Sequence, residues 1–137
     1  MMIEDLVPHR YPVLLIEKII SHQQDEIVCQ VDWRKTTFFH DQNGDLLAVS
    51  MPEMVAQAAA VMYGLQASEQ EATPALRMLA AIRQFSFFSL PEQDVLQVKV
   101  RVHSSLGLHQ VVYGSIYEGE KLLAEGMVFL FYKSVPV

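Results

Sequence analysis

The segment SMPEMVAQAAAVMYGLQAS, from Ser50 to Ser68, determines how the rest of this 137-residue chain is expected to fold. From Met54 to Leu65 it is apolar or small nearly all round, with Gln57 as the main polar interruption. A helix without a polar face is normally buried on all sides. Several small side chains keep this helix thin, so that a sheet can wrap closely around it: Ala56, Ala58, Ala59 and Ala60. We therefore expect a core helix.

The start of this helix carries signals that have two interpretations. Ser50 suits a cap, Pro52 suits a first turn, and Glu53 stands three residues after the serine. In a capping box, Glu53 would bond the backbone N–H of Ser50 and have a structural role alone. The alternative, which we favour, is that a carboxylate at the tip of a buried helix is a functional group.

The segments on either side of this helix predict β-structure. Val13–His22 and Asp25–Arg34 have the composition of two strands joined by a short turn, and in the second the apolar residues alternate with polar ones. After Pro74 the pattern predicts four more strands, at Met78–Phe88, Val95–His103, His109–Tyr117 and Lys121–Tyr132. This order predicts an α+β fold in a single domain, residues 1–137, with a curved antiparallel sheet of about six strands around the helix. One sheet leaves its edges open, which predicts a second subunit.

Composition and charge exclude several classes of protein. The formal net charge of −6 argues against a nucleic-acid binder, because phosphate contacts need a basic face. The single cysteine, Cys29, excludes an internal disulfide and leaves no cysteine cluster for zinc. The longest apolar run is too short for a membrane span, and no signal peptide is recognisable at the start. We expect a cytoplasmic protein that binds neither nucleic acid nor membranes.

The run Pro8-His9-Arg10-Tyr11-Pro12, placed before an apolar strand, resembles the opening of the (3R)-hydroxyacyl-[acyl-carrier-protein] dehydratases of the hotdog fold. The resemblance resumes at Phe38-Phe39, at Glu53-Met54-Val55-Ala56-Gln57-Ala58, and at Ile82–Leu96. It implies a homodimeric hotdog enzyme that dehydrates a 3-hydroxyacyl thioester on acyl carrier protein to the trans-2-enoyl thioester. It also implies that neither a metal nor an organic cofactor is needed.

The chain departs from that family between the Phe-Phe pair and the helix. Members carry a Gly-His-Phe-Pro-Gly segment there, with the catalytic histidine, and this chain has the shorter run His40-Asp41-Gln42-Asn43-Gly44-Asp45. The shortened loop is similar to that of a divergent branch, the predicted dehydratases of aryl-polyene gene clusters.

By this resemblance Glu53 is the catalytic acid or the group that orients water. Gln57, Met51 and Pro52 fall where the family contacts substrate. Gln57 has a second interpretation, as a buried amide that is satisfied by backbone or by its counterpart across a dimer axis. Amide N–H groups at the start of the helix are expected to polarise the thioester carbonyl.

Two histidines are candidates for the missing base. His9 lies in the opening motif, and its alternative role is to fix the N-terminal turn. His40 follows the Phe-Phe pair almost where the family's histidine should be, and its alternative is an exposed loop position.

The function also has alternatives. A hotdog thioesterase would use the same carboxylate to activate water. A non-catalytic subunit would retain the acyl-binding fold and pair with an active dehydratase. Because acyl carrier proteins are acidic, the expected docking patch is basic: Arg77, Arg83, Lys99 and Arg101, or alternatively Arg34 and Lys35.

Overall fold

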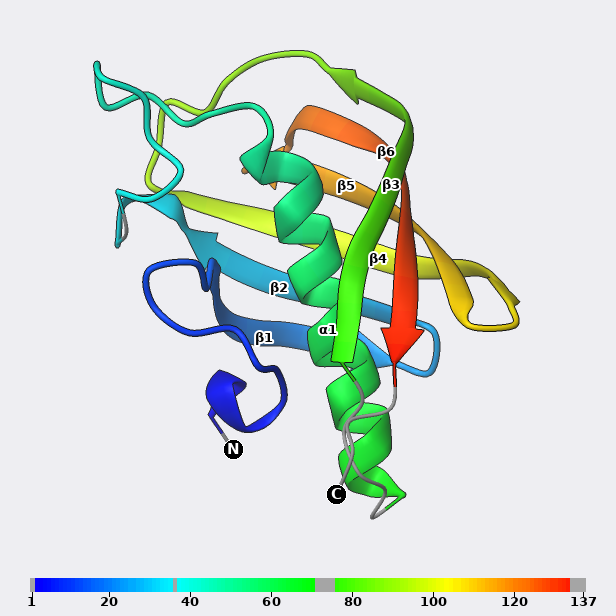
Figure 1. Ribbon diagram of the computed structural model, residues 1–137. Coiled ribbons are helices and arrows are strands. Elements are labelled where there is room, and N and C mark those ends of the chain that lie inside the picture. The colour runs from blue at the N-terminus through cyan, green and yellow to red at the C-terminus, as the bar shows by residue number, and fades with distance from the viewer. Residues whose placement is uncertain (1, 36, 71–75, 134–137) are drawn as a thin grey trace.

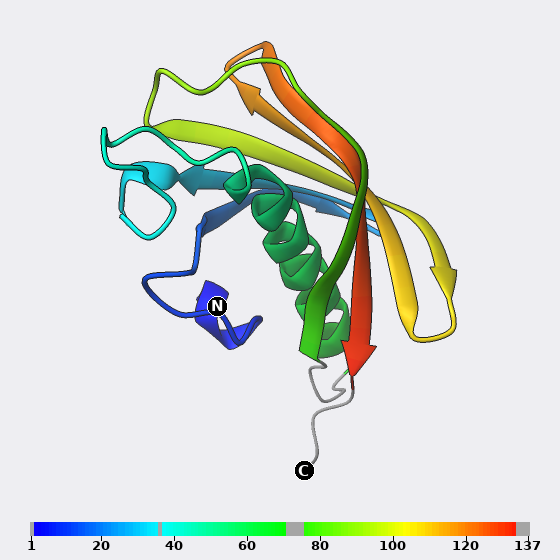
Figure 2. The ribbon, with the colours of Figure 1, turned by 45° about the horizontal axis from the view of Figure 1, so that its top comes forward.

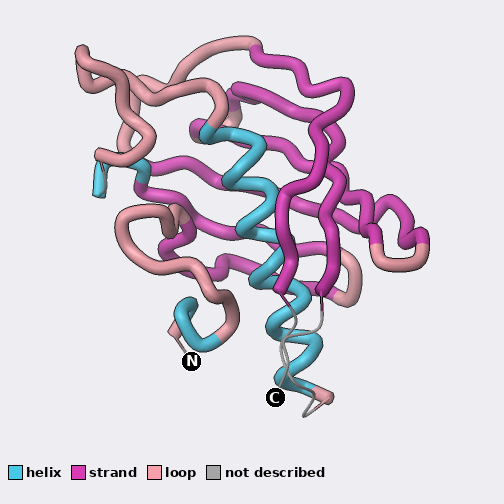
Figure 3. Tube along the Cα trace, viewed as in Figure 1, coloured by secondary structure: helices cyan, strands magenta, loops and turns pink. Residues whose placement is uncertain are grey.

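A computed structural model describes residues 2–35, 37–70 and 76–133, and it contains one long helix and six strands (Figures 1 and 3). The elements, in chain order, are η1 (Ile3–Asp5), β1 (Ile16–Gln23), β2 (Glu26–Asp32), η2 (Trp33–Lys35), α1 (Ser50–Glu69), β3 (Leu76–Phe87), β4 (Val95–Leu106), β5 (His109–Glu118) and β6 (Lys121–Lys133). The two strands before the helix and the four after it are those that the sequence predicts.

The six strands form one antiparallel sheet in the order β1-β2-β4-β5-β6-β3. The sheet curves around α1, which crosses its concave face (Figure 2). This is the hotdog fold that was expected, in which one curved antiparallel sheet surrounds a long central helix.

The sheet can approach α1 closely because its inner face is apolar and, at one point, has no side chain. In β2 the buried residues are Ile27, Cys29 and Val31, which alternate with partly exposed ones as the sequence pattern predicts. In β5, Val55 of α1 lies so close over Gly114 that a Cβ atom there would collide with the valine side chain. The close packing of helix on sheet therefore depends on a glycine as well as on the alanines of the helix.

The helix is buried from Ser50 to Gly64, apart from Glu53, and it ends at Glu69, one residue beyond the apolar segment quoted from the sequence. Its start differs from the predicted capping box. Ser50 is the first residue of the helix, its hydroxyl donates to the carbonyl of Leu47 at 2.7 Å, and the helix has no side-chain cap. The capping-box interpretation of Ser50 and Glu53, which was set against a functional role, is therefore wrong, because the glutamate side chain contacts Gln57 instead.

The first strand begins later than the pattern predicts. Val13 was expected to open it, but β1 begins at Ile16. The backbone groups of Val13 and Leu15 bond to the side chain of Gln57 instead of to a neighbouring strand. Likewise β2 stops at Asp32, because the next three residues form the 3-10 turn η2.

The two edges of the sheet are β1 and β3. Large apolar side chains are exposed along and just beyond β3, among them Ile82, Phe87, Phe88 and Leu90. An open edge with exposed apolar side chains is a typical place for another chain to bind.

Candidate active site

Glu53 lies in the first turn of α1 and is the acidic residue of that turn. Its side chain is 22% exposed, whereas the neighbouring Met51, Pro52 and Met54 are buried. A negative charge here is stabilised by the positive end of the helix dipole. Glu53 is thus a charged group at the opening of an otherwise apolar core. Substrate contact by the buried Met51 and Pro52 remains a prediction.

Gln57, one turn further along α1, is fully buried and uses both ends of its amide. Its Oε1 accepts from the backbone N–H of Leu15 at 2.7 Å, and its Nε2 donates to the carbonyl of Val13 at 2.9 Å and to Oε1 of Glu53 at 3.1 Å. Because the backbone N–H of Leu15 can only donate, the orientation of the amide is fixed. Gln57 is therefore a buried amide satisfied by backbone, as its second interpretation has it, and it also contacts the candidate acid. Substrate contact by Gln57 stays a prediction.

His9 lies beside Glu53, with its Nε2 atom 3.9 Å from Oε1 of the carboxylate. The two side chains are 19% and 22% exposed, so the pair is mostly shielded from solvent. Burial lowers the pKa of His9 below its ordinary value; Glu53 opposes this shift, and the neighbouring Arg10 adds to it. A histidine with a lowered pKa is neutral at pH 7, which is the form that accepts a proton.

The turn that carries His9 is tied by Arg10. The Nη1 atom of Arg10 donates to the carbonyl oxygens of Val7 and His9, both at 2.8 Å. Arg10 therefore ties the backbone of the turn that carries His9, and it also lowers the pKa of the imidazole. Arg10 had no role among the expectations from the sequence, although its place next to the histidine in the Pro-His-Arg run was a signal that could have suggested one.

His40, the other candidate base, is engaged elsewhere. Its Nε2 lies 2.9 Å from the backbone carbonyl of Trp33, and its ring packs edge-on against the indole at 5.2 Å. Within the residues that the structure describes, no contact joins His40 to Glu53 or His9. The fold thus brings His9, Glu53 and Gln57 together and keeps His40 as an anchor of the loop before α1.

The first amide groups of the helix are already bonded. The N–H of Ser50 donates to Leu47, that of Met51 donates to Ala48, and Pro52 has no N–H. The expectation that the start of the helix polarises the thioester carbonyl is therefore wrong for these three residues.

The basic residues named from the sequence lie on different faces. Lys99 and Arg101 alternate with the buried Val98 and Val100, so they point away from α1. For Arg77 the side chain lies outside the described residues. Arg34 and Lys35 lie in η2, near the end of the molecule where α1 begins (Figure 1); they pair with Asp94 at 2.7 Å and with Glu17 at 3.0 Å.

Across the described ranges, no cluster of three or more His, Cys, Asp or Glu side chains is arranged to hold a metal ion. In the same residues, no helix is long and apolar enough to cross a membrane.

Comparison with known proteins assigns the family. The family model of the ApeP-like dehydratases, described as ApeP dehydratase, matches residues 1–135. This chain belongs to the ApeP-like dehydratase family. The resemblance to the aryl-polyene branch, drawn above from short motifs, is thereby confirmed over nearly the whole length.

A curated relative of this ApeP-like dehydratase is the 3-hydroxyacyl-[acyl-carrier-protein] dehydratase FabZ of Legionella pneumophila. The two are 28% identical over 123 residues, which cover 85% of this chain and 82% of the relative.

Solved structures confirm the hotdog fold. The dehydratase heterocomplex ApeI:P from Xenorhabdus doucetiae matches with a TM-score of 0.90 and 23% identity, covering 98% of this chain and 92% of that one. A hypothetical thioesterase with coenzyme A from Streptococcus pneumoniae matches less closely, with a TM-score of 0.63 and 9% identity over 88% of both chains. At these identities the likeness concerns the fold alone.

Proposed function

We propose that this ApeP-like dehydratase removes water from a 3-hydroxyacyl thioester carried on acyl carrier protein, with His9 as the base and Glu53 as the acid. The observation that supports this most directly is the His9–Glu53 pair, 3.9 Å apart at the open end of the buried helix. The name of the FabZ relative supports the substrate class.

The reaction needs one proton removed and one proton supplied. Neutral His9 takes the proton from C2, next to the thioester carbonyl, and those electrons form the double bond between C2 and C3. His9 passes this proton to the Glu53 carboxylate, over the 3.9 Å between Nε2 and Oε1. The bond from C3 to the hydroxyl oxygen breaks, and Glu53 gives the proton to this oxygen, so that water leaves. Neutral His9 and the Glu53 carboxylate are then both restored.

Gln57 serves this chemistry as a positioning residue. It holds Oε1 of Glu53 at 3.1 Å and is itself fixed by Val13 and Leu15. A carboxylate held in this way does not need to be reoriented in each turnover.

The direct test is to supply a 3-hydroxyacyl thioester on carrier protein and follow the absorbance of the enoyl product. A dehydratase gives enoyl thioester with no free thiol. Release of free thiol without enoyl product would contradict the proposal and indicate the thioesterase alternative.

The carrier protein is proposed to dock at Arg34 and Lys35. These cations precede the loop that leads into α1, near the end of the molecule where α1 begins (Figure 1), whereas Lys99 and Arg101 face away from α1. A carrier bound on the outer face would present its thioester on the wrong side of the sheet. Charge reversal of Arg34 and Lys35 should raise KM for the carrier substrate, in a salt-dependent way. Equal turnover by the reversed variant would count against this dock.

The proposed assembly is a homodimer in the cytoplasm, joined through the open edge at β3. The exposed apolar side chains near that edge, Ile82 and Phe87 among them, support such an interface. The heterocomplex ApeI:P favours one alternative, in which this chain works with a different dehydratase subunit and is inactive alone. Sedimentation of the purified chain, with the activity assay on the same sample, separates the two. An active dimer supports the first, and an inert chain that gains activity with a second dehydratase supports the alternative.

A further inference from the structure

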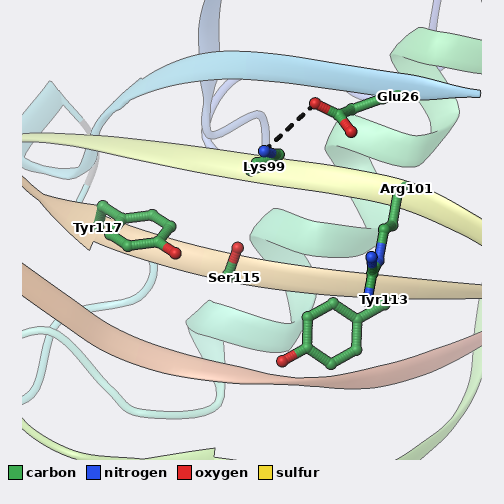
Figure 4. A pocket seen from close by; sticks show the side chains of 6 residues that line it. All are labelled: Glu26, Lys99, Arg101, Tyr113, Ser115 and Tyr117. Carbon is green, nitrogen blue, oxygen red and sulfur yellow. Dashed lines mark ion pairs between the residues drawn. The ribbon is translucent and has the colours of Figure 1, made fainter.

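A hollow lies on the outer face of the sheet, on the side away from α1 (Figure 4). It has a volume of about 230 Å³, and side chains of three neighbouring strands line it: Glu26, Lys99, Arg101, Tyr113, Ser115 and Tyr117. The pairing of Lys99 with Ser115 and of Arg101 with Tyr113 brings these residues together across β4 and β5. None of them takes part in the dehydration proposed above.

The hollow contains hydrogen-bond donors that have no protein acceptor. Ser115 is only 6% exposed although it is on the outer face, and its hydroxyl bonds to nothing in the described part of the chain. The same holds for the hydroxyl of Tyr117 and for the guanidinium N–H groups of Arg101. The Ser115 hydroxyl and the Arg101 guanidinium are therefore both free to donate to an acceptor that enters the hollow.

The charges around the hollow leave Arg101 as the unpaired cation. Lys99 is 3.3 Å from Glu26, and these two charges offset each other. Glu125, on the next strand, accepts from the hydroxyl of Tyr113 and does not line the hollow. The guanidinium of Arg101 stacks on the ring of Tyr113 at 4.9 Å, with no carboxylate in ion-pair range among the described residues. Stacking holds an arginine in place while its edge stays free to bond an oxyanion.

We propose that this hollow binds a single carboxylate group, on a ligand about as large as a glutamate side chain. Arg101 and Ser115 would donate to the carboxylate oxygens, and Tyr117 would supply a further hydroxyl. The group has two potential sources, a small free dicarboxylate or an acidic side chain of a partner protein, and the chemistry recognised is the same. Because the hollow and the His9–Glu53 pair are on opposite sides of the sheet, neither proposal depends on the other.

The test is an NMR titration of the isotopically labelled full chain with glutarate, with neutral glutaramide as the matched control. We expect saturable shifts of the amide signals of Tyr113, Ser115 and Tyr117 with glutarate and none with glutaramide. Arg101→Gln should weaken binding by roughly tenfold, the usual loss for a hydrogen bond to a charged group. Ser115→Ala, which removes a donor without changing charge, should weaken it by a smaller factor. Lys121→Gln, an exposed cation at the β5–β6 turn, should leave it unchanged.

A blocked tripeptide with glutamate between two serines distinguishes the sources. Tighter binding of the peptide supports an acidic side chain of a partner, and tighter binding of glutarate supports a small ligand. The proposal is overturned if neither probe gives saturable shifts, if glutaramide gives the same shifts, or if folded Arg101→Gln and Ser115→Ala both bind as the unaltered chain does.

Discussion

The amide nitrogen of Gln57 donates to Oε1 of Glu53 across one turn of α1, at 3.1 Å. The same amide bonds to the backbone of Val13 and Leu15, which follow the turn that carries His9. One buried side chain therefore couples the helix with the acid to the segment with the base.

Glu53→Gln should remove most activity and leave the fold intact. The glutamine keeps an oxygen that can accept from Gln57, so the free energy of unfolding should change by at most about 1 kcal/mol. Turnover should fall by roughly a hundredfold or more, the usual contribution of a positioned acid. Glu69→Gln, at the exposed end of the same helix, is the control and should be silent. Full turnover by Glu53→Gln would show that the site is assigned wrongly.

The two histidines should respond in opposite ways. His9→Ala should abolish turnover, because it removes the proposed base beside Glu53. His40→Ala should lower stability by about 1 kcal/mol through loss of its bond to the Trp33 carbonyl, with turnover nearly unchanged. Thermal unfolding and the enoyl assay on both variants check this. The reverse result would make His40 the base.

Gln57→Leu should be strongly destabilising. It leaves the N–H of Leu15 and the carbonyl of Val13 without partners in a buried place, and each such group costs about 1–3 kcal/mol. Urea denaturation gives the measurement. Gln66→Leu, on the same helix with one bond to the carbonyl of Gln24, is the matched control and should cost much less. A loss for Gln57→Leu no larger than that of the control would contradict the coupling described above.

The proton affinity of His9 should be visible in both activity and stability. Burial places its pKa in the folded chain below the ordinary value of 6.5, so the folded chain binds fewer protons than the unfolded chain as pH falls through that range. The contribution of neutral His9 to the free energy of unfolding is complete above pH 6.5. It declines as pH falls from 6.5 toward the pKa of His9 in the folded chain. Activity should be lost only below the folded pKa, where the base becomes protonated.

Two variants test whether Glu53 raises and Arg10 lowers the pKa of His9. Glu53→Gln should lower the pKa of His9 further, because Glu53 raises it, and Arg10→Gln should increase it, because Arg10 lowers it. NMR titration of the imidazole signals in each variant measures these shifts. Shifts in the opposite directions, or none, would contradict the geometry given for this turn.

Cys29 should be chemically inert until the protein unfolds. Its side chain is fully buried in β2, and burial raises the pKa of its thiol to about 12. Because the thiolate is the reactive form, a thiol reagent at mildly alkaline pH should react at least about a hundredfold more slowly with folded than with urea-unfolded protein. Comparable rates in the two states would show that the core opens at Cys29.

The sequence determined the fold and the family, because both follow from patterns along the chain. An apolar helix of small residues predicted a buried core element, and alternation in β2 and β4 predicted strands with one inner face. The same alternation has Lys99 and Arg101 on the face of β4 opposite the buried valines.

Only the tertiary structure decided which groups meet. His9 and Glu53 are far apart in the sequence, and no periodic pattern shows that the N-terminal turn returns to the start of α1. Ser50 and His40 had plausible local roles, and both are instead bonded to backbone carbonyls nearby. The reason is physical. A local pattern determines which face of an element is buried. The meeting of His9 and Glu53 depends instead on how buried polar groups, here those of Gln57, find their partners when the whole chain packs.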